Sequence, residues 1–346
     1  MKTKTSKTFY LRTTRRRSGF ILVTVLMIIV ILTAVLLEFN YESRLHLHSA
    51  DHFTSDQQSL NCARAGLNIA IAALRVEPDI STDNKPGKQT KENPPLPVGS
   101  GFCKITVTEE NGKINLNTLK DQKGNLNRSH IDQLLRFIDL LNKEYSFQPS
   151  LPYDIVPAII DWTDADDKVT VLPFVRIRNR GAESNYYQNL KSPYSCTNLP
   201  FTTLEEINLI RGMNRDIFEL KTKTKDSVIS LRDYLTVHGE GKININTAPA
   251  LVLQSLSEQI TPALARMIVT RRRQIPFENI SELRDLPGFS AVIYQGIRNR
   301  VTVQPKNRYY HVSARGYAQK ARSTINAVLK RNTQTNKIDI IYYREI

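Results

Sequence analysis

The chain has 346 residues, a length typical of about two domains, and its 48 basic and 33 acidic side chains give a formal net charge of +15. A hydrophobic content of 40% excludes a fully disordered chain, and 14 glycines and 16 prolines are too few for a collagen-like or low-complexity protein. Three cysteines exclude a disulfide-dense scaffold and a cysteine-rich zinc protein.

Residues 1–19 form a basic leader with seven Lys and Arg side chains and no acid, so the rest of the chain is only mildly basic. Residues 20–37 are almost purely apolar and, as a helix, would rise about 27 Å, enough to span most of a bilayer's hydrocarbon core. Because basic side chains stay on the cytoplasmic side, we expect a single-pass anchor in a bacterial inner membrane, with the leader inside and the rest of the chain periplasmic. A single apolar run of this length excludes a multi-span transporter.

A small residue, Gly19, directly precedes the apolar run and follows three arginines and Ser18. No A-x-A site follows the run, as it would in a secretory signal peptide. This order resembles the type IV prepilin signal; a plain signal anchor in which Gly19 is incidental is the alternative. The resemblance implies cytoplasmic cleavage after Gly19 by prepilin peptidase, with Phe20 as the new N-methylated terminus.

Counted from Phe20, the fifth residue is Thr24, where most pilins and pseudopilins have Glu. A carboxylate in the bilayer is costly unless it is paired, and in that family it is thought to meet the terminal amine of the subunit ahead. Thr24 therefore indicates either that the chain is no pilin or that no subunit lies ahead of it. The second case resembles the minor pseudopilin K of type II secretion systems, a class that lacks this Glu.

Residues 38–76 continue as a predicted helix with one apolar stripe, in which Phe53, Leu60, Leu67 and Leu74 recur every seven residues. The helix resembles a pilin spine, with residues 20–37 as its transmembrane half; a coiled-coil stalk is the alternative. The stripe is predicted to face either the chain's own sheet or a neighbouring subunit. Residues 77–101 are rich in Pro and Gly and are predicted to be an exposed linker.

Residues 102–110 alternate between apolar and polar side chains and are predicted to form a strand. Three more strands are predicted near the C-terminus, over residues 309–318, 323–331 and 337–343. A lone strand cannot bury its apolar face, so residues 102–110 and 304–346 are expected to form one pilin-like antiparallel sheet against the spine helix. Residues 111–303 must then be a large, mainly helical insertion, and the fold class is α+β.

The insertion contains a repeat: residues 112–118 (GKINLNT) recur as residues 241–247 (GKININT). Such a match indicates two related units, starting near residues 111 and 241. In each copy a short strand should end in Asn-Thr, which caps the next helix. Helices are predicted over residues 129–143, 152–161, 248–257, 262–273 and 280–286.

The repeat, residues 160–167 (IDWTDADD) and residues 276–288 (PFENISELRDLPG) together resemble type II secretion system protein K. The resemblance implies an insertion of two SAM-like, helix-hairpin-helix-like halves and a tip complex with minor pseudopilins I and J, which H joins. It also implies that the protein initiates or caps a short pseudopilus that exports folded proteins across the outer membrane, without catalysis of its own. A minor pilin of a type IV pilus is an alternative.

An acidic loop contains Asp161, Asp164, Asp166 and Asp167. Several carboxylates on a short loop suit Ca²⁺, which prefers six to eight oxygen ligands. The spacing is not that of an EF-hand, and a solvated loop without metal is the alternative. The resemblance to the family favours Ca²⁺.

Residues 283–289 (LRDLPGF) resemble a helix-hairpin-helix, a motif that presents backbone N–H groups to DNA phosphates. Four arginines lie upstream, Arg266, Arg271, Arg272 and Arg273. A membrane-anchored DNA receptor is therefore another alternative. Ser290 stands where such receptors usually have a second Gly, and DNA binding explains neither Gly19 nor the terminal sheet. We therefore do not expect nucleic acid as a partner.

We expect no enzymatic activity, because the chain has no Gly-x-Ser-x-Gly, phosphate-binding loop or His-Glu-x-x-His motif. His48 and His52 are four residues apart on the spine helix, and polar surface explains them as well as a metal does. Cys103 and Cys196 would both be periplasmic, where a disulfide between them or free thiols are equally consistent with the sequence.

Overall fold

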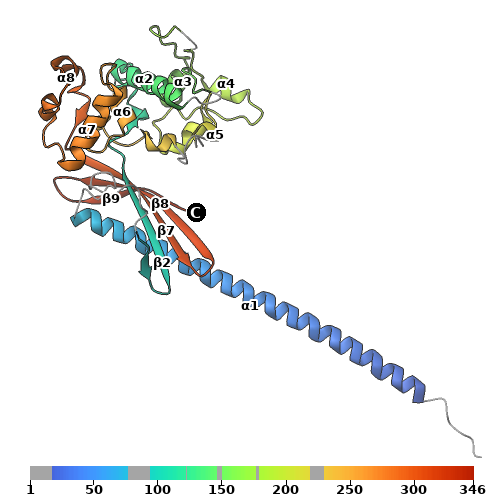
Figure 1. Ribbon diagram of the computed structural model, residues 1–346. Helices are drawn as coiled ribbons and strands as arrows, with labels where there is room; N and C mark the ends of the chain where they lie inside the picture. The colour runs from blue at the N-terminus through green and yellow to red at the C-terminus, as the bar shows by residue number, and fades with distance from the viewer. Residues whose placement is uncertain (1–17, 77–93, 122, 146–149, 177–178, 219–229) are drawn as a thin grey trace, which may run out of the picture.

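The computed structural model describes residues 18–76, 94–121, 123–145, 150–176, 179–218 and 230–346. The basic leader, except for its last two residues, and the greater part of the predicted linker lie outside the described residues. The molecule has three parts: a long helix, a sheet packed on one end of that helix, and a helical body beyond the sheet (Figure 1).

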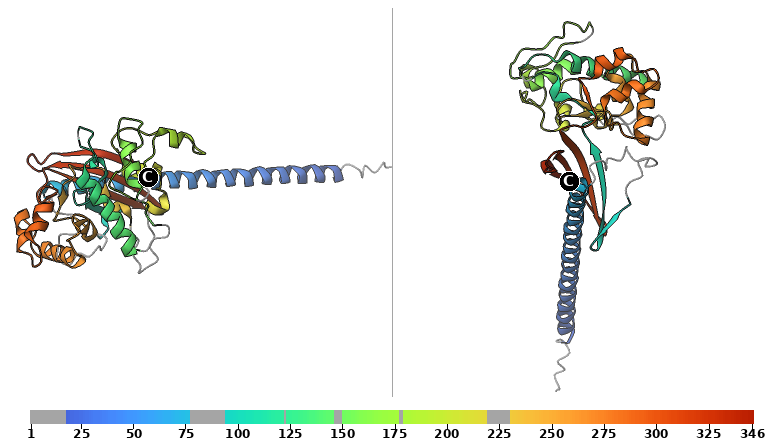
Figure 2. Two further views of the ribbon diagram at one scale, coloured as in Figure 1. Left: turned by 90° about the horizontal axis from the view of Figure 1, so that it is seen from above. Right: turned by 90° about the vertical axis from the view of Figure 1, so that its left-hand side faces the viewer.

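The long helix α1 (Ser18–Val76) confirms the predicted spine and ends at the predicted residue. Its first half extends away from the body and is exposed all round (Figures 1 and 2). In the described part of the chain, this is the helix that is long and apolar enough to cross a membrane. Its second half packs on the sheet, which buries Leu67 and Leu74 together with Val312 and Leu329 of the sheet.

The sheet has five antiparallel strands in the order β1-β2-β7-β8-β9. The strands are β1 (Leu96–Val98), β2 (Gly101–Glu109), β7 (Asn307–Ala318), β8 (Ala321–Asn332) and β9 (Ile338–Glu345). Strand β2 pairs with β7 although about 200 residues separate them in the chain. The prediction of a sheet split by an insertion is therefore confirmed.

Strand β1 corrects the predicted linker, whose last residues were expected to be irregular. Leu96 pairs with Cys103 and Val98 with Gly101, through a turn in which Gly99 has a φ of +57°. Pro97 does not prevent this pairing, because β1 is at the edge of the sheet and a missing N–H is tolerated there.

The helix packs very closely on the sheet at Gly316 of β7. A Cβ at this position would collide with the backbone carbonyl oxygen of Ser59 and the backbone nitrogen of Ala63, both on α1. A glycine is therefore needed here for packing, since its φ is not in the left-handed region. The contact sets how deeply the stripe of α1 enters the sheet.

The insertion is mainly helical and is built around one hydrophobic core, which includes Phe137, Trp162, Ile243 and Leu253. Its α-helices are α2 (Arg128–Tyr145), α3 (Ile155–Thr163), α4 (Ser184–Gln188), α5 (Arg215–Phe218), α6 (Ala250–Ser255), α7 (Pro262–Gln274) and α8 (Ala291–Ile297). Its 3-10 helices are η1 (Leu116–Thr118), η2 (Leu204–Leu209), η3 (Leu231–Asp233) and η4 (Ile280–Asp285). The helix predicted over residues 280–286 is thus the 3-10 helix η4, and α4, α5 and α8 were not predicted.

Each copy of the repeat contributes one strand to a pair of two-residue parallel strands. Strand β3 (Ile114–Asn115) pairs in parallel with β4 (Leu235–Thr236), and β5 (Ile243–Asn244) pairs in parallel with β6 (Val301–Thr302). In each unit the GKIN segment therefore forms the first strand, and a later strand of the same unit pairs with it. In both copies the first Asn of the repeat accepts a hydrogen bond from the backbone N–H two residues on, at 2.9 Å and 3.1 Å.

The second Asn of each repeat holds the backbone of a buried phenylalanine. Asn117 Nδ2 donates to the carbonyl of Phe201 at 3.0 Å and its Oδ1 accepts from Phe201 N–H at 2.8 Å; Asn246 makes the same pair with Phe277 at 2.9 Å and 2.9 Å. A capping box follows each phenylalanine, and a glycine with positive φ ends each segment. The segment at residues 276–288 thus has an earlier structural copy at residues 200–212.

One large difference between the two units follows the second helix of each. In unit two, Phe277 follows closely after the end of α7 at Gln274. In unit one, α3 ends at Thr163, and residues 164–199 intervene before the equivalent segment. We call residues 164–199 the unit-one insert. Its described part has little regular structure, so side-chain interactions must fix its conformation.

Candidate functional site

The acidic residues of the unit-one insert form the clearest chemical site in the described residues. Asp164, Asp166 and Glu183 each offer a carboxylate oxygen, and these oxygens lie within 4.8 Å of one another. We call these three residues the acidic centre. Asp164 and Asp166 come from the loop after α3, and Glu183 is the residue before α4.

Two of the four residues predicted for this loop, Asp161 and Asp167, lie outside the acidic centre, and their role as metal ligands stays a prediction. Asp161 is fully buried at the end of α3, where Oδ1 accepts the backbone N–H of Thr170 at 2.9 Å, and it is not in the acidic centre. Asp167 is exposed and also lies outside it. Glu183 was missed, because no spacing rule joins it to Asp164; only the path of the insert brings the two together.

Burial makes the acidic centre electrostatically unusual. Glu183 is 3% exposed, and neither of its carboxylate oxygens has a hydrogen-bond partner in the described residues; the same is true of Asp164 Oδ1. Burial, with a smaller effect of the charges on Asp161 and Asp164, raises the pKa of Glu183 to about 8. Burial also raises the pKa of Asp161 to about 6. Buried carboxylates without partners are costly, and a bound cation removes that cost.

The donor set fits a hard cation such as Ca²⁺. All the available atoms are carboxylate oxygens, which Ca²⁺ prefers, and the unpartnered oxygens of Glu183 and Asp164 are free to bind it. His and Cys ligands, which zinc and other softer metals prefer, do not contribute to the acidic centre.

Lys120 reaches the acidic centre from outside the insert. Its ammonium group donates to Asp164 Oδ2, and its side chain is 21% exposed. Lys120 follows the first GKIN repeat and forms an isolated antiparallel β-bridge with Leu126. The lysine thus joins the body of unit one to the insert. Sequence reasoning did not single it out, because a lone lysine has no motif.

Aromatic side chains pack against one another in the segments that carry the acidic centre. Trp162, on α3, meets Tyr187 edge-on at 5.2 Å between ring centroids, and Tyr187 stacks on Tyr194 at 5.2 Å. Trp162 and Tyr187 are buried, and they lie close in the chain to Asp164 and Glu183 respectively. Cys196 is also in the insert, and its thiol points to the carbonyl of Ala182.

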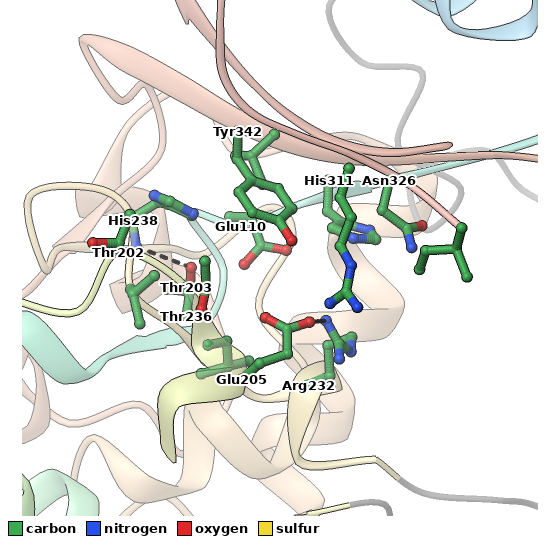
Figure 3. A pocket seen from close by; sticks show the side chains of 15 residues that line it. Glu110, Thr202, Thr203, Glu205, Arg232, Thr236, His238, His311, Asn326 and Tyr342 are labelled. Carbon is green, nitrogen blue, oxygen red and sulfur yellow. Dashed lines mark hydrogen bonds and ion pairs between the residues drawn. The ribbon is translucent and has the colours of Figure 1, made fainter. Parts of the chain in front are cut away.

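A second polar cluster lies at the junction between insertion and sheet, around a cavity of about 60 Å³. In Figure 3, Glu205 and Arg232 of unit one form an ion pair, opposite His311, Asn326 and Tyr342 of the sheet. Burial lowers the pKa of His311 and of His238 below the ordinary histidine value. A cavity of this volume has room for a few water molecules and is small for an organic ligand.

Asn111 fixes the two parts to each other. Its side chain donates to the carbonyl of Asn307 at 3.0 Å and accepts from Tyr309 N–H at 2.7 Å, both in the sheet. Its own carbonyl accepts the N–H of Asn244, in unit two, at 2.8 Å. The junction is therefore closely hydrogen-bonded from both sides.

The residues predicted for assembly differ in how far they are exposed. Phe53 is 67% exposed, and Leu60 is partly buried against the sheet. Leu67 and Leu74 are 4% and 0% exposed in the chain's own core, which corrects their prediction as a surface for partners. The sequence left open whether the stripe faces the chain's own sheet or a neighbouring subunit. Leu67 and Leu74 face the sheet, whereas Phe53, nearer the apolar half of α1, is exposed.

At the processing end, Phe20 is exposed on α1 and Gly19 lies within the same helix. The Thr24 hydroxyl donates to the carbonyls of Phe20 and Ile21, at 2.7 Å and 3.0 Å, so its own helix satisfies it. Thr24 therefore places no charge in the apolar half of α1 and needs no partner there.

Two of the four arginines near the hairpin take part in packing, whereas Arg266 and Arg273 are exposed. Arg272 is buried and donates to the carbonyls of Ile245 and Ala248 at 2.6 Å and 2.7 Å. Arg271 lies over the ring of Phe277 and pairs with Glu282. His48 and His52 are exposed on α1.

The cysteines also depart from the pairing considered from sequence. Cys103 and Cys62 lie near each other in the core between α1 and the sheet, whereas Cys196 is in the insertion. All three are free thiols.

Comparisons with known proteins agree with this architecture. Two family models, both described as type II secretion system (T2SS) protein K, match residues 112–222 and 243–304, together half of the chain. The type II secretion system protein K of Aeromonas hydrophila is 20% identical over 301 residues, which cover 81% of this chain and 85% of that protein.

A solved structure shows the same fold. A chain in the crystal structure of the GspK-GspI-GspJ complex from the enterotoxigenic Escherichia coli type 2 secretion system matches with a TM-score of 0.61 and 17% identity. The match covers 87% of this chain and 99% of that chain. With the split sheet, the duplicated insertion and both family models in agreement, the chain belongs to the type II secretion system protein K family.

Proposed function

We propose that this protein is the minor pseudopilin at the tip of a type II secretion pseudopilus, where it initiates or caps the fibre. The observation that carries the proposal is the combination of a pilin-like spine and sheet with a bulky body beyond the sheet (Figure 2). A fibre repeats one subunit position along its axis, and this bulk fits at an end more readily than at every repeat. Thr24 supports the same position, because a tip subunit has no amine ahead of it to neutralise.

The proposed partners are the minor pseudopilins I and J, with H joining the tip. A relative of the same fold was crystallised in a GspK-GspI-GspJ complex. The exposed apolar side chains of α1 beyond the membrane span, Phe39, Leu45, Leu47 and Phe53 among them, are a suitable surface for neighbouring spine helices. Leu67 and Leu74 are excluded from this surface by their burial.

We place the chain in the bacterial inner membrane with a cytoplasmic N-terminus and a periplasmic body. Prepilin peptidase would cut after Gly19 and leave Phe20 as the mature terminus. The role is mechanical: the assembled fibre pushes folded proteins through an outer-membrane channel, and this subunit performs no catalysis.

We further propose that the acidic centre holds Ca²⁺. Asp164, Asp166 and Glu183 would provide the ligands from the chain, and the cation would supply positive charge to carboxylates that burial otherwise penalises. Its role would be to fix the unit-one insert, which has little regular structure.

Co-purification tests the tip assignment. We expect the full chain, expressed with its own system's I and J, to be recovered from detergent-solubilised membranes as a three-protein complex. A Phe53→Asp variant should weaken recovery, whereas Lys123→Asp, in an exposed loop of the insertion, should not. Failure of the wild-type chain to retain I and J, together with salt-dependent binding to DNA, would favour the DNA-receptor alternative.

A further inference from the structure

The position of Lys120 bears on how tightly the acidic centre binds its cation. Asp164 has two oxygens in different situations: Oδ2 accepts from the Lys120 ammonium group, and Oδ1 is buried without a partner in the described residues. Glu183 also has two unpartnered oxygens. The metal-free centre therefore has one ammonium group, at Asp164 Oδ2. Asp166 is exposed, and its Oδ1 accepts the backbone N–H of Lys168 at 2.9 Å. The buried oxygens without a hydrogen-bond partner in the described residues are Asp164 Oδ1 and the two of Glu183.

Lys120 acts on more than one carboxylate of this region. Its charge opposes the effect of burial on Asp161 as well as on Asp164. It is mostly buried, so solvent screens this interaction less than it would at the surface. An ammonium group and a divalent cation that face the same carboxylate repel each other, and each reduces the benefit of the other.

We propose that Lys120 competes with the bound cation and thereby sets the affinity of the acidic centre. In the metal-free protein the ammonium group supplies part of the positive charge that the centre needs, and the cation replaces it on binding. The lysine also belongs to the body of unit one, so its release from Asp164 changes how the insert is tied to that body. This inference rests on the proposed metal centre.

The single tryptophan offers a direct readout. Trp162 is the one tryptophan of the chain, and it is two residues from Asp164. Tb³⁺, a Ca²⁺ substitute, emits when a nearby excited indole transfers energy to it. Titration of the full-length protein in detergent with Tb³⁺, followed by displacement with Ca²⁺, therefore reports binding at this centre in wild type and variants.

The test compares Lys120→Met with Lys120→Arg and with Lys123→Met, an exposed lysine in the same loop. We expect Lys120→Met to bind Ca²⁺ about tenfold more tightly, since it removes a repelling charge. Lys120→Arg and Lys123→Met should keep the wild-type affinity. Lys120→Met should also have a lower Tm than wild type in EDTA, and this difference should disappear at saturating Ca²⁺.

Two results would overturn the proposal. Unchanged or weaker Ca²⁺ binding by Lys120→Met would mean that the lysine does not compete, and weaker binding would mean that it orients Asp164 instead. Absence of a Tb³⁺ signal from the wild-type protein would overturn the metal centre itself, and with it this inference, but not the tip assignment.

A measurement on the unmodified chain guards against a variant that fails to fold. If Ca²⁺ displaces the ammonium group, amine acetylation of Lys120, followed by mass spectrometry of its peptide, should become several-fold faster when Ca²⁺ is added. Acetylation of Lys123 should not change. An equal or slower rate at Lys120 with Ca²⁺ bound would contradict the competition.

Discussion

His311 sits at the junction of sheet and insertion, and its charge state links folding to pH. Burial is the largest cause that lowers its pKa; Lys113 and Arg232 lower it further, and Glu110 and Glu205 oppose them. The folded protein therefore keeps this imidazole neutral at a pH where the unfolded chain, with a pKa of about 6.5, takes up a proton. Its contribution to stability is complete above that pH and is lost as the pH falls toward the lowered pKa.

We expect a His311→Gln variant to lose part of this pH dependence. Between pH 7.5 and pH 5.5 the free energy of unfolding of wild type should fall by about 1 kcal/mol more than that of the variant. Denaturant titrations at the two pH values, with Ca²⁺ held at saturation, measure the difference. If wild type and variant lost equal stability, His311 would not be the group that titrates.

The residues of the acidic centre show what a sequence reveals about a site and what it does not. Asp164 and Asp166 could be predicted because they lie together in one acidic loop. Glu183 could not, because it reaches them through the irregular path of the insert, and Lys120 could not, because it comes from the body of unit one. Local composition predicts the loop, whereas the ligand set depends on tertiary structure.

At the scale of elements, the contact between α1 and β7 depends on the lack of a side chain at Gly316. We expect Gly316→Ala to lower the free energy of unfolding by about 3 kcal/mol, because its methyl group would collide with the backbone of α1, which cannot move easily. Gly296→Ala is the matched control: it is on exposed α8 with open space around it and should be neutral or slightly stabilising.

Thermal melting of both variants in detergent compares them with wild type. A Gly316→Ala protein that melted like Gly296→Ala would show that the helix can move away from the sheet at little cost. In that case the close approach of α1 to β7 would not be what fixes the depth of the spine stripe.

The repeated units explain why one part of the duplication was visible in the sequence and another was not. The GKIN segments retain nearly identical residues because both asparagines have specific backbone partners. In the segments at residues 200–212 and 276–288, the capping residue is Thr203 in one unit and Asn279 in the other. The chemistry is kept while the residue types differ, so identity alone did not reveal the earlier copy.

For the molecule as a whole, the split sheet and spine could be predicted because a lone alternating strand needs partners and the apolar run is long. Strand β1 was missed, since its proline-rich sequence resembles a linker and its pairing depends on an edge that only the fold creates. Helices α4, α5 and α8 were missed because each is at most seven residues long, which is too short for a clear helical period, and no repeat marks its start as the second GKIN segment does for the equally short α6. Tertiary packing stabilises such helices.

This architecture separates three tasks along one axis. The exposed apolar half of α1 anchors the protein, the sheet fixes the spine, and the insertion lies at the far end (Figure 1). That order suits the proposed tip position, in which the bulk would lie away from the membrane and leave the spine accessible to the subunits behind it.

The central claim is that the chain enters the pseudopilin route, and the mature N-terminus tests it most directly. The full chain would be expressed with its prepilin peptidase and its terminal peptide read by mass spectrometry, beside a control prepilin. We predict a chain that begins with N-methylated Phe20. An intact leader on this chain, in cells that process the control, would contradict the assignment.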